Sequence, residues 1–406
     1  MATKTDSPPA VEPRPQMRLR AVNMSGSPAL GVGNPISLKI EPERTVLVGR
    51  NGAGKSAIIE AMYLGFRYPM VARQAGPSSF HVMLEGDDGR QLHYSYQWVS
   101  EIQKLATADP DSLLPKRRWS EKCWWGSEKT QPVWDLQDGK LILVGDSQSP
   151  LSLPLGTSLL QLGFEVGGVE RVHEEIGILS ALCRSTRIGA GVPREEQNRS
   201  DVLFRLRKLE GRQYWMAVGP SQHRLSVPLL RIMRWFDFDK DQFKHFEDLG
   251  KLLGVFEKVE VETYKISAGS SDSGELGALL FDKVNAGLLA DGTLRMIETL
   301  VSLISRAPGT ILLIEEPETA IHPGILTKLL SVIESYSHDR QVVYSTHSPL
   351  VVSHAKPREM RLVERRNRAT HVRNLSTEES GNVVKYLEDH GNLGEFVFSG
   401  GIDDGA

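Results

Sequence analysis

Residues 49–56 place the strongest limits on how this chain can fold. They read Gly-Arg-Asn-Gly-Ala-Gly-Lys-Ser and match G-x-x-x-x-G-K-[ST] without a gap. Glycines let the backbone curl tightly, so that several N–H groups point at one phosphate-sized anion. Residues 45–48 are an apolar run typical of a buried strand, and residues 57–62 are typical of a helix opening. We therefore expect a strand, a phosphate-binding loop and a helix in direct succession.

The loop predicts a binding site for ATP or GTP with Mg²⁺. The Lys55 ammonium is expected to reach the β- and γ-phosphates, and the Ser56 hydroxyl to ligate Mg²⁺. The phosphates would lie at a helix N-terminus, where free N–H groups and the macrodipole favour negative charge. A glycine-rich turn without a ligand is the alternative, and the agreement of strand, loop and helix disfavours it. The expected nucleotide-binding residues are Gly49, Arg50, Asn51, Gly52, Ala53, Gly54, Lys55 and Ser56.

Bulk properties exclude several classes of protein. The chain has 406 residues, of which 40% are hydrophobic, and a formal net charge of −3. Its overall charge therefore does not attract it to nucleic acid or to a membrane surface. No apolar run approaches the length that spans a bilayer. Cys123 and Cys183 are far apart in the sequence, which fits a reducing compartment, and we expect a cytoplasmic protein. Residues 1–16 lack the apolar segment of a signal peptide, and we expect a disordered tail there.

Two acidic residues end a second apolar strand. Residues 311–314 are fully apolar and run into Glu315 and Glu316. Open α/β sheets place their ligands at the carboxyl ends of buried parallel strands. We expect Glu315 to hold Mg²⁺ and Glu316 to orient or deprotonate the attacking water. Without a phosphate-binding loop elsewhere in the chain, the pair would be read as a solvated strand end.

Two weaker motifs accompany this strand. His347 follows the predicted strand 341–346, and its imidazole is expected to contact the γ-phosphate. An Asp-Gly-Thr turn opens an apolar helix at residues 296–304, where an anion could bind by the same dipole effect. An ordinary helix cap is the alternative, and the order of the motifs along the chain favours the functional interpretation. The turn consists of Asp291, Gly292 and Thr293.

The stretch 116–125 combines Lys and Arg with three tryptophans. Such a stretch can grip phosphates while bases stack on the indoles. The sequence favours the other reading, a surface loop that buries its tryptophans against a neighbouring domain, because one basic stretch in an acidic chain is weak support for nucleic-acid binding.

Hydrophobic periodicity predicts the remaining elements. The helix after the phosphate-binding loop is expected to end before Pro69. Glycine-containing turns predict two hairpins, at residues 80–96 and 134–144. Further strands are expected at 17–22, 35–40, 202–206, 214–218, 259–266, 360–363 and 370–373, and further helices at 169–184, 228–236, 243–253 and near 383–387.

The order of these motifs resembles the ATP-binding-cassette (ABC) type ATPase heads of the SMC, RecF and OLD group. GRNGAGKS resembles their Walker A motif, LLIEEPE their Walker B motif with its catalytic Glu, LADGTLR a degenerate LSGGQ signature, and STHSP their switch His. EEPETAIHP is typical of small bacterial OLD-like ATPases. The resemblance is good over residues 17–64 and 286–352.

The resemblance implies an α/β fold: a P-loop NTPase head of ABC type with a mixed sheet and an inserted α+β lobe. The head would comprise residues 17–99 and 267–406, and the lobe residues 100–266. It also implies a homodimer that sandwiches two ATP molecules, with Asp291, Gly292 and Thr293 acting in trans and residues 320–322 at the D-loop position. Two positions depart from the pattern: Glu315 replaces an Asp, and Ala290 replaces a Ser.

The same resemblance implies hydrolysis of ATP to ADP and phosphate, with Lys55, Glu316 and His347 as catalytic residues and with dimerisation that gates a partner. OLD proteins usually carry a TOPRIM nuclease, for which the chain after His347 has no evident motif. We therefore expect a separately encoded effector, such as a nuclease or toxin of a bacterial antiviral defence module. The alternatives are a nucleotide-locked module with slow turnover and an SMC- or RecF-like DNA-binding ATPase. A transporter is disfavoured.

Overall fold

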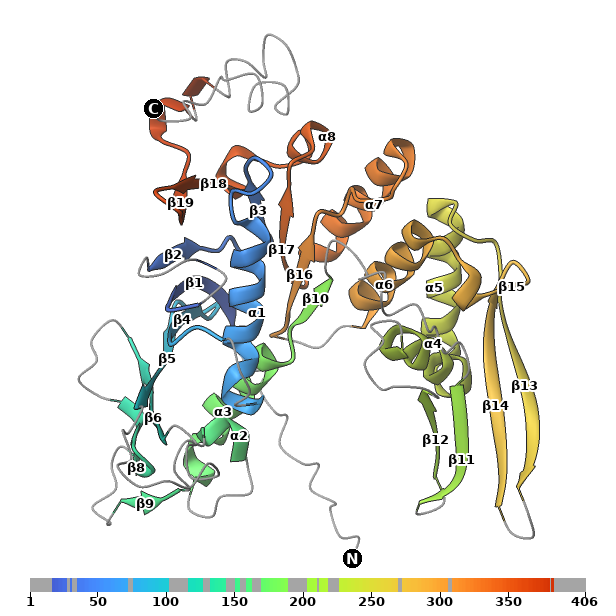
Figure 1. Ribbon diagram of the computed structural model, residues 1–406, viewed down its shortest axis with the longest axis horizontal. Coiled ribbons are helices and arrows are strands. Elements are labelled where there is room, and N and C mark those ends of the chain that lie inside the picture. The colour runs from blue at the N-terminus through green and yellow to red at the C-terminus, as the bar shows by residue number, and fades with distance from the viewer. Residues whose placement is uncertain are drawn as a thin grey trace, which may run out of the picture.

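The computed structural model describes most of the chain, in which three β-sheets are joined through α-helices (Figure 1). None of the helices in this part of the chain is long and apolar enough to cross a bilayer. The expected tail at 1–16 and the expected helix near 383–387 lie outside the described residues. Those are residues 17–27, 30, 35–71, 76–101, 116–126, 132–143, 150–153, 158–162, 169–188, 203–209, 212–217, 226–268, 272–305, 309–379 and 381–382.

A six-stranded sheet forms the centre of the molecule. Its first five strands are parallel, and the sixth is antiparallel to its neighbour. Every residue of the three central strands is buried, as expected for a parallel sheet that is covered on both faces. The strand order is β10 (Thr186–Ile188), β16 (Ile311–Glu315), β17 (Gln341–Thr346), β3 (Arg44–Val48), β18 (Met360–Arg366) and β19 (Ala369–Asn374).

An eight-stranded antiparallel sheet covers one side of this centre. The two predicted hairpins are confirmed as β4–β5 and β7–β8, and Asp138 and Gly139 take the positive φ angles that a tight hairpin turn needs. The strand order is β2 (Ile36–Lys39), β1 (Arg18–Ser25), β4 (Ser79–Glu85), β5 (Gln91–Glu101), β6 (Lys116–Trp125), β7 (Pro132–Gln137), β8 (Lys140–Leu143) and β9 (Leu151–Ser152).

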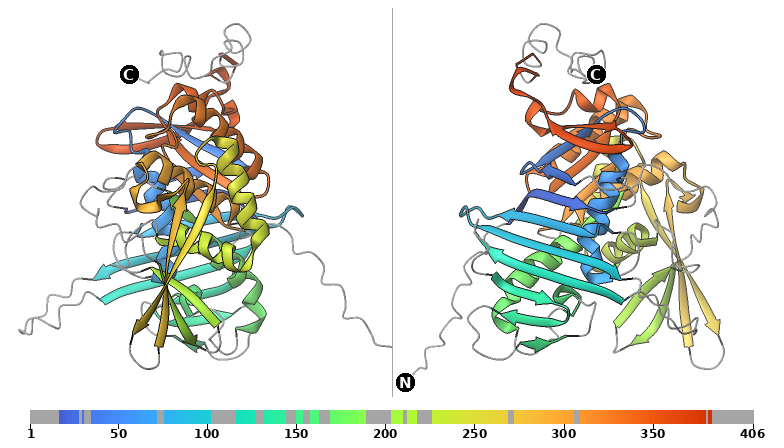
Figure 2. Two further views of the ribbon diagram at one scale, coloured as in Figure 1. Left: turned by 90° about the vertical axis from the view of Figure 1, so that its right-hand side faces the viewer. Right: turned by 60° about the vertical axis from the view of Figure 1, so that its left-hand side comes forward.

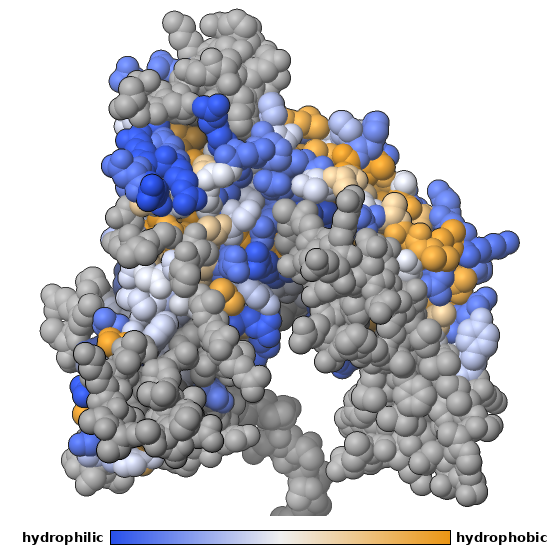
Figure 3. Space-filling model, in the orientation of Figure 1, coloured by the Kyte–Doolittle hydropathy of each residue, from blue (hydrophilic) through white to orange (hydrophobic). Residues whose placement is uncertain are grey.

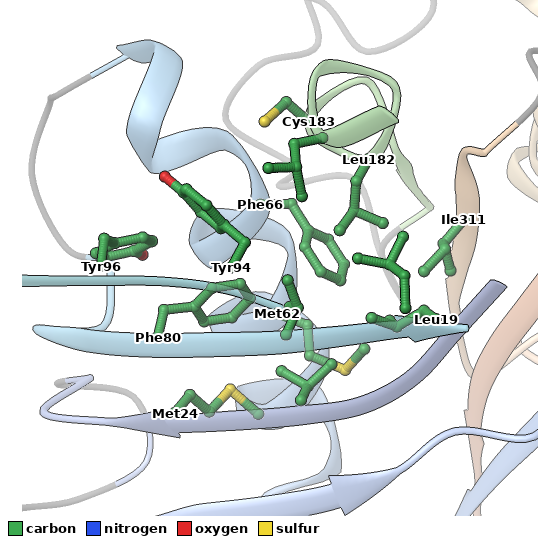
Figure 4. Packing of buried hydrophobic residues seen from close by; sticks show 14 of the residues in the cluster. Leu19, Met24, Met62, Phe66, Phe80, Tyr94, Tyr96, Leu182, Cys183 and Ile311 are labelled. Atoms are coloured by element: carbon green, nitrogen blue, oxygen red, sulfur yellow. The ribbon is translucent and has the colours of Figure 1, made fainter. Parts of the chain in front are cut away.

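Helix α1 (Lys55–Val71) lies between these two sheets and shares one hydrophobic core with both. Figure 4 shows Met62 and Phe66 of α1 among the side chains of β1, β4 and β16. The short helix α2 (Leu159–Leu162) and helix α3 (His173–Cys183), preceded by a 3-10 turn at Glu170–Val172, close the end of this core. The expected end of α1 before Pro69 is wrong. Proline here costs only a hydrogen bond of the last turn, and the helix continues to Val71.

A second core fills the opposite face of the central sheet. The helices that pack there are α4 (Ser226–Phe238), α5 (Lys240–Leu253), α6 (Asp291–Ile304), α7 (Pro323–Ser337) and the short α8 (Pro349–Val352). A third sheet lies beyond them, on the far side of the molecule from the eight-stranded sheet (Figure 2). It contains β12 (Arg212–Ala217), β11 (Leu203–Leu209), β14 (Asp272–Phe281) and β13 (Val259–Ala268), with β15 (Val284–Asn285) paired to β14.

Three expectations differ from the structure. Leu252, expected in the apolar stripe of α5, is 60% exposed, because it lies on the outer side of the helix. The surface loop expected at 116–125 is wrong: this stretch is β6, an interior strand of the eight-stranded sheet, although Trp119 and Trp124 are buried as anticipated. The sheets also cross the expected lobe boundary, since β6 pairs with β5 and β10 pairs with β16. The division into head and lobe stays a prediction.

Candidate nucleotide site

The carboxyl ends of three adjacent parallel strands meet at one edge of the central sheet. Val48 at the end of β3 is level with Thr346 at the end of β17, and Ser345 is level with Glu315 at the end of β16. The chain then runs into the loop 49–54, into His347, and into residues 316–318. The structure thus brings the loop 49–54 together with two motifs that follow it by more than 250 residues in the sequence, at the edge where parallel sheets bind ligands.

Backbone geometry at the phosphate-binding loop requires its glycines. Gly52 and Gly54 have φ angles of 81° and 105°, a region that side chains with a Cβ rarely adopt. A Cβ on Gly54 would also collide with the Thr370 side chain of β19, and one on Gly49 with the Val363 carbonyl of β18. The loop is therefore held against the last two strands of the sheet, and α1 begins directly after it at Lys55.

The Lys55 ammonium lies inside the loop. Its Nζ donates to the carbonyl oxygens of Gly49 at 2.8 Å and Arg50 at 3.1 Å, and the residue is 4% exposed. Burial lowers the pKa of Lys55, and the carboxylates of Glu316 and Glu318 partly oppose that shift. Lys55 therefore lies within the electrostatic field of the acidic strand end, as a site with one cationic and one anionic wall requires.

Glu315 points toward the side of the sheet that α1 covers. Side chains alternate along a strand, and Ile311 and Leu313 pack in the core that contains α1, whereas Leu312 and Ile314 pack in the other core. Glu315 lies two residues after Leu313, so its side chain is on the same face of the sheet as that of Leu313, and the residue is 4% exposed. Its Oε1 accepts a hydrogen bond from Nε of Arg187 on β10 at 2.6 Å and forms an ion pair with Nη2 of the same residue, also at 2.6 Å.

Glu316 sits at a sharp turn of the backbone. Its φ angle is 44°, a left-handed conformation that is uncommon outside glycine and that concentrates at functional sites. Its N–H donates to the Ser345 carbonyl at 3.0 Å. Nη2 of Arg295, on α6, donates to the carbonyl oxygens of both Glu315 and Glu316, the latter at 2.9 Å. These contacts hold the turn in place at the end of β16.

Glu318 connects this turn to the end of β17. Its Oε1 accepts from Thr346 Oγ1 at 2.6 Å and from the His347 backbone N–H at 3.1 Å. The His347 imidazole contacts both acids, with Nδ1 at 3.3 Å from Glu316 Oε1 and 3.5 Å from Glu318 Oε1. The predicted catalytic pair of Glu316 and His347 is therefore in direct contact, and Glu318 fixes its geometry.

The predicted signature residues Asp291, Gly292 and Thr293 are the first residues of α6. A Cβ on Gly292 would come closer than 3.0 Å to the carbonyl oxygen of Ala320, whose own φ angle is 61°. His322, at the end of the expected D-loop, caps α7 by accepting from the Gly324 N–H at 3.2 Å. The signature turn and the 316–322 segment are thus packed against each other within one chain.

Oxygen donors near the loop suit a hard cation. Ser56 offers a hydroxyl and Glu315 a carboxylate, the ligand types that Mg²⁺ prefers, and Mg²⁺ usually completes its shell with water and phosphate oxygens. In the described part of the chain, no group of three or more His, Cys, Asp or Glu residues is arranged to hold a metal without such help. The donor set therefore fits Mg²⁺ bound together with a nucleotide.

Sequence reasoning missed three residues of this site. Glu318 could have been found from the sequence, because it lies two residues beyond Glu316. Arg295 carried a weak signal, as the basic residue that ends the LADGTLR stretch. Arg187 carried none, because β10 is three residues long and its partner Glu315 is 128 positions away.

The strand order, the glycine loop and the acidic strand end are those of an α/β P-loop nucleotide-binding fold. A family model described as "AAA domain, putative AbiEii toxin, Type IV TA system" matches residues 197–353. This segment is less than half of the chain. It contains the signature turn, the acidic strand end and His347, and it does not contain the loop 49–56. A search of curated proteins finds no match.

Solved structures of SMC head domains are similar to this chain at low sequence identity. One is the SMC head bound to the C-winged helix domain of ScpA (10% identity, TM-score 0.45, covering 89% of this chain and 99% of that chain). Another is the SMC head domain from Thermotoga maritima (13%, 0.40, 89% and 100%). A third is the Smc head domain with an extended coiled coil bound to the C-terminal domain of ScpA, derived from Pyrococcus furiosus (11%, 0.38, 92% and 100%). These scores are low, and the class assigned above depends on the topology and the motifs.

Proposed function

We propose that this protein binds ATP with Mg²⁺ and hydrolyses it to ADP and phosphate. The observation that supports this most directly is that the glycine loop before Lys55 and the contacting pair Glu316 and His347 follow the adjacent carboxyl ends of β3, β16 and β17. A site of this kind combines a cationic phosphate cradle with a carboxylate that can act on water. Both are needed for phosphoryl transfer, which depends on positioning and electrostatic stabilisation.

Each residue of the site has a role in this proposal. The loop 49–54 cradles the phosphates with its N–H groups, and Lys55 leaves its carbonyl partners to reach the β- and γ-phosphates. Mg²⁺, held by Ser56 and Glu315, would neutralise phosphate charge when it is bound. Glu316 accepts a proton from the attacking water, and His347, which touches the same carboxylate, contacts the γ-phosphate.

We further propose that two chains close over two nucleotides. The signature turn at Asp291, Gly292 and Thr293 would face the phosphates of the second chain. Leu288, three residues before this turn, is 77% exposed, and such a large apolar side chain beside a polar turn suits a surface that is covered in a dimer. Closure and opening of this dimer would signal to a separately encoded effector in a bacterial defence module, consistent with the toxin–antitoxin wording of the matching family.

Phosphate release measured on purified protein tests the hydrolysis. We expect Glu316→Gln to lower the rate by at least about 100-fold, because general-base catalysis contributes about 10²- to 10⁴-fold, while nucleotide affinity is retained. Lys55→Ala should abolish nucleotide binding. Glu262→Gln, an exposed acid on β13, is the control and should behave as wild type. Equal rates for wild type and Glu316→Gln would exclude Glu316 as the base, and no turnover in wild type with intact binding would favour a nucleotide-locked module.

A further inference from the structure

We infer that Arg187 is a positioning residue that sets the affinity of this site for Mg²⁺. The inference rests on the function proposed above. It concerns a residue on β10, outside the phosphate-binding loop and outside the acidic strand end. Arg187 is the guanidinium that contacts the expected metal ligand Glu315.

The geometry of the ion pair leaves one carboxylate oxygen for a metal. Nε of Arg187 donates to Oε1 of Glu315, and Nη2 forms an ion-pair contact with the same oxygen, so the guanidinium holds the carboxylate through a single oxygen. Both side chains are largely shielded from water, with 19% of Arg187 and 5% of Glu315 exposed. Oε2 carries the remaining lone pairs and is the oxygen that a Mg²⁺ ion, or a water bound to it, would meet.

A second contact ties Arg187 to the helix that carries the other expected ligand. Nη1 of Arg187 lies 3.9 Å from Oε1 of Glu60, on α1. Glu60 is four residues after Ser56, so the two lie on the same face of α1, one turn apart. The guanidinium therefore spans the gap between β16 and α1 and contacts both elements that would supply protein ligands to the ion.

The length of the Glu315 side chain explains why such a residue is needed. A glutamate has one more rotatable bond than an aspartate, so its carboxylate occupies a larger volume unless something holds it. A planar guanidinium that meets one carboxylate oxygen with both Nε and Nη2 limits that freedom in a way that a lysine ammonium does not. Outer contacts of this kind orient metal ligands, and their removal typically lowers metal affinity about 10- to 100-fold.

The test compares nucleotide affinity with and without Mg²⁺, using a fluorescent ATP analogue and the full chain. We expect Arg187→Met to raise the Mg²⁺ concentration for half-maximal enhancement of binding about tenfold. Affinity in EDTA should stay within about twofold of wild type, because the loop 49–56 is unchanged. Arg187→Lys keeps the positive charge but replaces the planar guanidinium with an ammonium. This variant should also need several-fold more Mg²⁺ for half-maximal enhancement of binding.

Arg20→Met is the matched control, since Arg20 forms a 2.7 Å ion pair with Glu85 on the eight-stranded sheet. It should leave the Mg²⁺ response unchanged, and thermal melting would confirm that each variant is folded. An unchanged or a lower Mg²⁺ requirement in Arg187→Met would overturn the inference; a lower one would mean that the guanidinium competes with the ion. Absence of nucleotide binding by wild type in both conditions would instead refute the proposed function itself, and this inference with it.

Discussion

Glu121 is a carboxylate buried on the inner face of the eight-stranded sheet. It is 1% exposed, and its two oxygens accept hydrogen bonds from the indole N–H groups of Trp119 at 3.1 Å and Trp134 at 3.2 Å. Burial raises its pKa to about 7, although these hydrogen bonds oppose the shift. The protein therefore contains a buried acid that titrates near neutral pH, away from the nucleotide site.

This raised pKa predicts a dependence of stability on pH. The folded state holds the Glu121 proton more tightly than the unfolded state, whose pKa is about 4.3. The stabilisation from this group is complete below pH 4 and is lost as the pH rises toward 7, by on the order of 3 kcal/mol. Between pH 5 and pH 8, we expect the melting temperature of wild type to fall by several degrees relative to that of Glu121→Gln.

A glutamine side chain has one acceptor oxygen, so it can accept from only one of the two indole N–H groups, and Glu121→Gln changes stability at every pH. The quantity to compare is therefore how the melting temperature of each protein changes with pH. Glu85→Gln, which removes a half-exposed acid on β4, is the control and should follow wild type over this range. Parallel profiles for wild type and Glu121→Gln would show that Glu121 does not titrate near neutrality.

At the scale of elements, helix α6 is joined to the catalytic turn by a close backbone contact. Gly292 packs on the Ala320 carbonyl, and Arg295 one turn later donates to the carbonyls of Glu315 and Glu316. A backbone carbonyl cannot move aside as a side chain can. Movement of the start of α6 therefore has to move residues 315–320, which include the expected base.

We expect Gly292→Ala to lower the free energy of unfolding by about 1–3 kcal/mol, the usual cost of forcing atoms into a packed site. Gly177→Ala is the matched control: Gly177 lies inside helix α3, and a Cβ there meets nothing within 4 Å. That change should stabilise the protein by about 0.5–1 kcal/mol, since alanine is the better helix former. Urea denaturation measures both, and a neutral Gly292→Ala would contradict the close contact between α6 and Ala320.

Most elements of the central sheet could be predicted, because their sequences are unambiguous. The strands β3, β16 and β17 are apolar runs with every residue buried, and the turn chemistry of Asp138-Gly139 specifies a hairpin. Strand β6 was mistaken for a loop for an identifiable reason. Its inner face carries the buried Glu121 between Trp119 and Cys123, so the alternation of apolar and polar residues is broken where the sheet hides a carboxylate.

The phosphate-binding and acidic motifs could be found from sequence because each is a contiguous run with its own chemistry. The contacts between them could not. Arg187 reaches Glu315 across 128 positions, and Arg295 reaches the same strand end across 20. Such pairs are decided by strand order, and the order β10-β16-β17-β3 joins four segments that the sequence presents as β3, β10, β16 and β17. Local periodicity carries no information about that rearrangement.

For the molecule as a whole, the distribution of exposed apolar side chains favours a surface beside the signature turn. Among the residues coloured in Figure 3, apolar side chains gather at the upper right, in the region of α5, α6 and α7. The large apolar side chains exposed on these elements and just before α6 include Leu252 at 60% and Leu288 at 77%. With a net charge of −3, two copies of this chain repel each other only weakly, so net charge does not oppose the proposed dimer.

This view predicts dimerisation that depends on ATP. In a Glu316→Gln background, which should keep the nucleotide intact, light scattering coupled to size exclusion should give about twice the monomer mass with ATP and Mg²⁺, and the monomer mass without them. Adding Leu288→Asp places a charge in the proposed contact and should raise the concentration for half-dimerisation at least tenfold, since one buried unpaired charge costs more than about 1.4 kcal/mol. Ile142→Asp, at a similarly exposed position on β8 of the eight-stranded sheet, should have no effect. A monomer at every ATP concentration would refute the proposed sandwich, whereas a dimer equally sensitive to both aspartates would place the interface elsewhere.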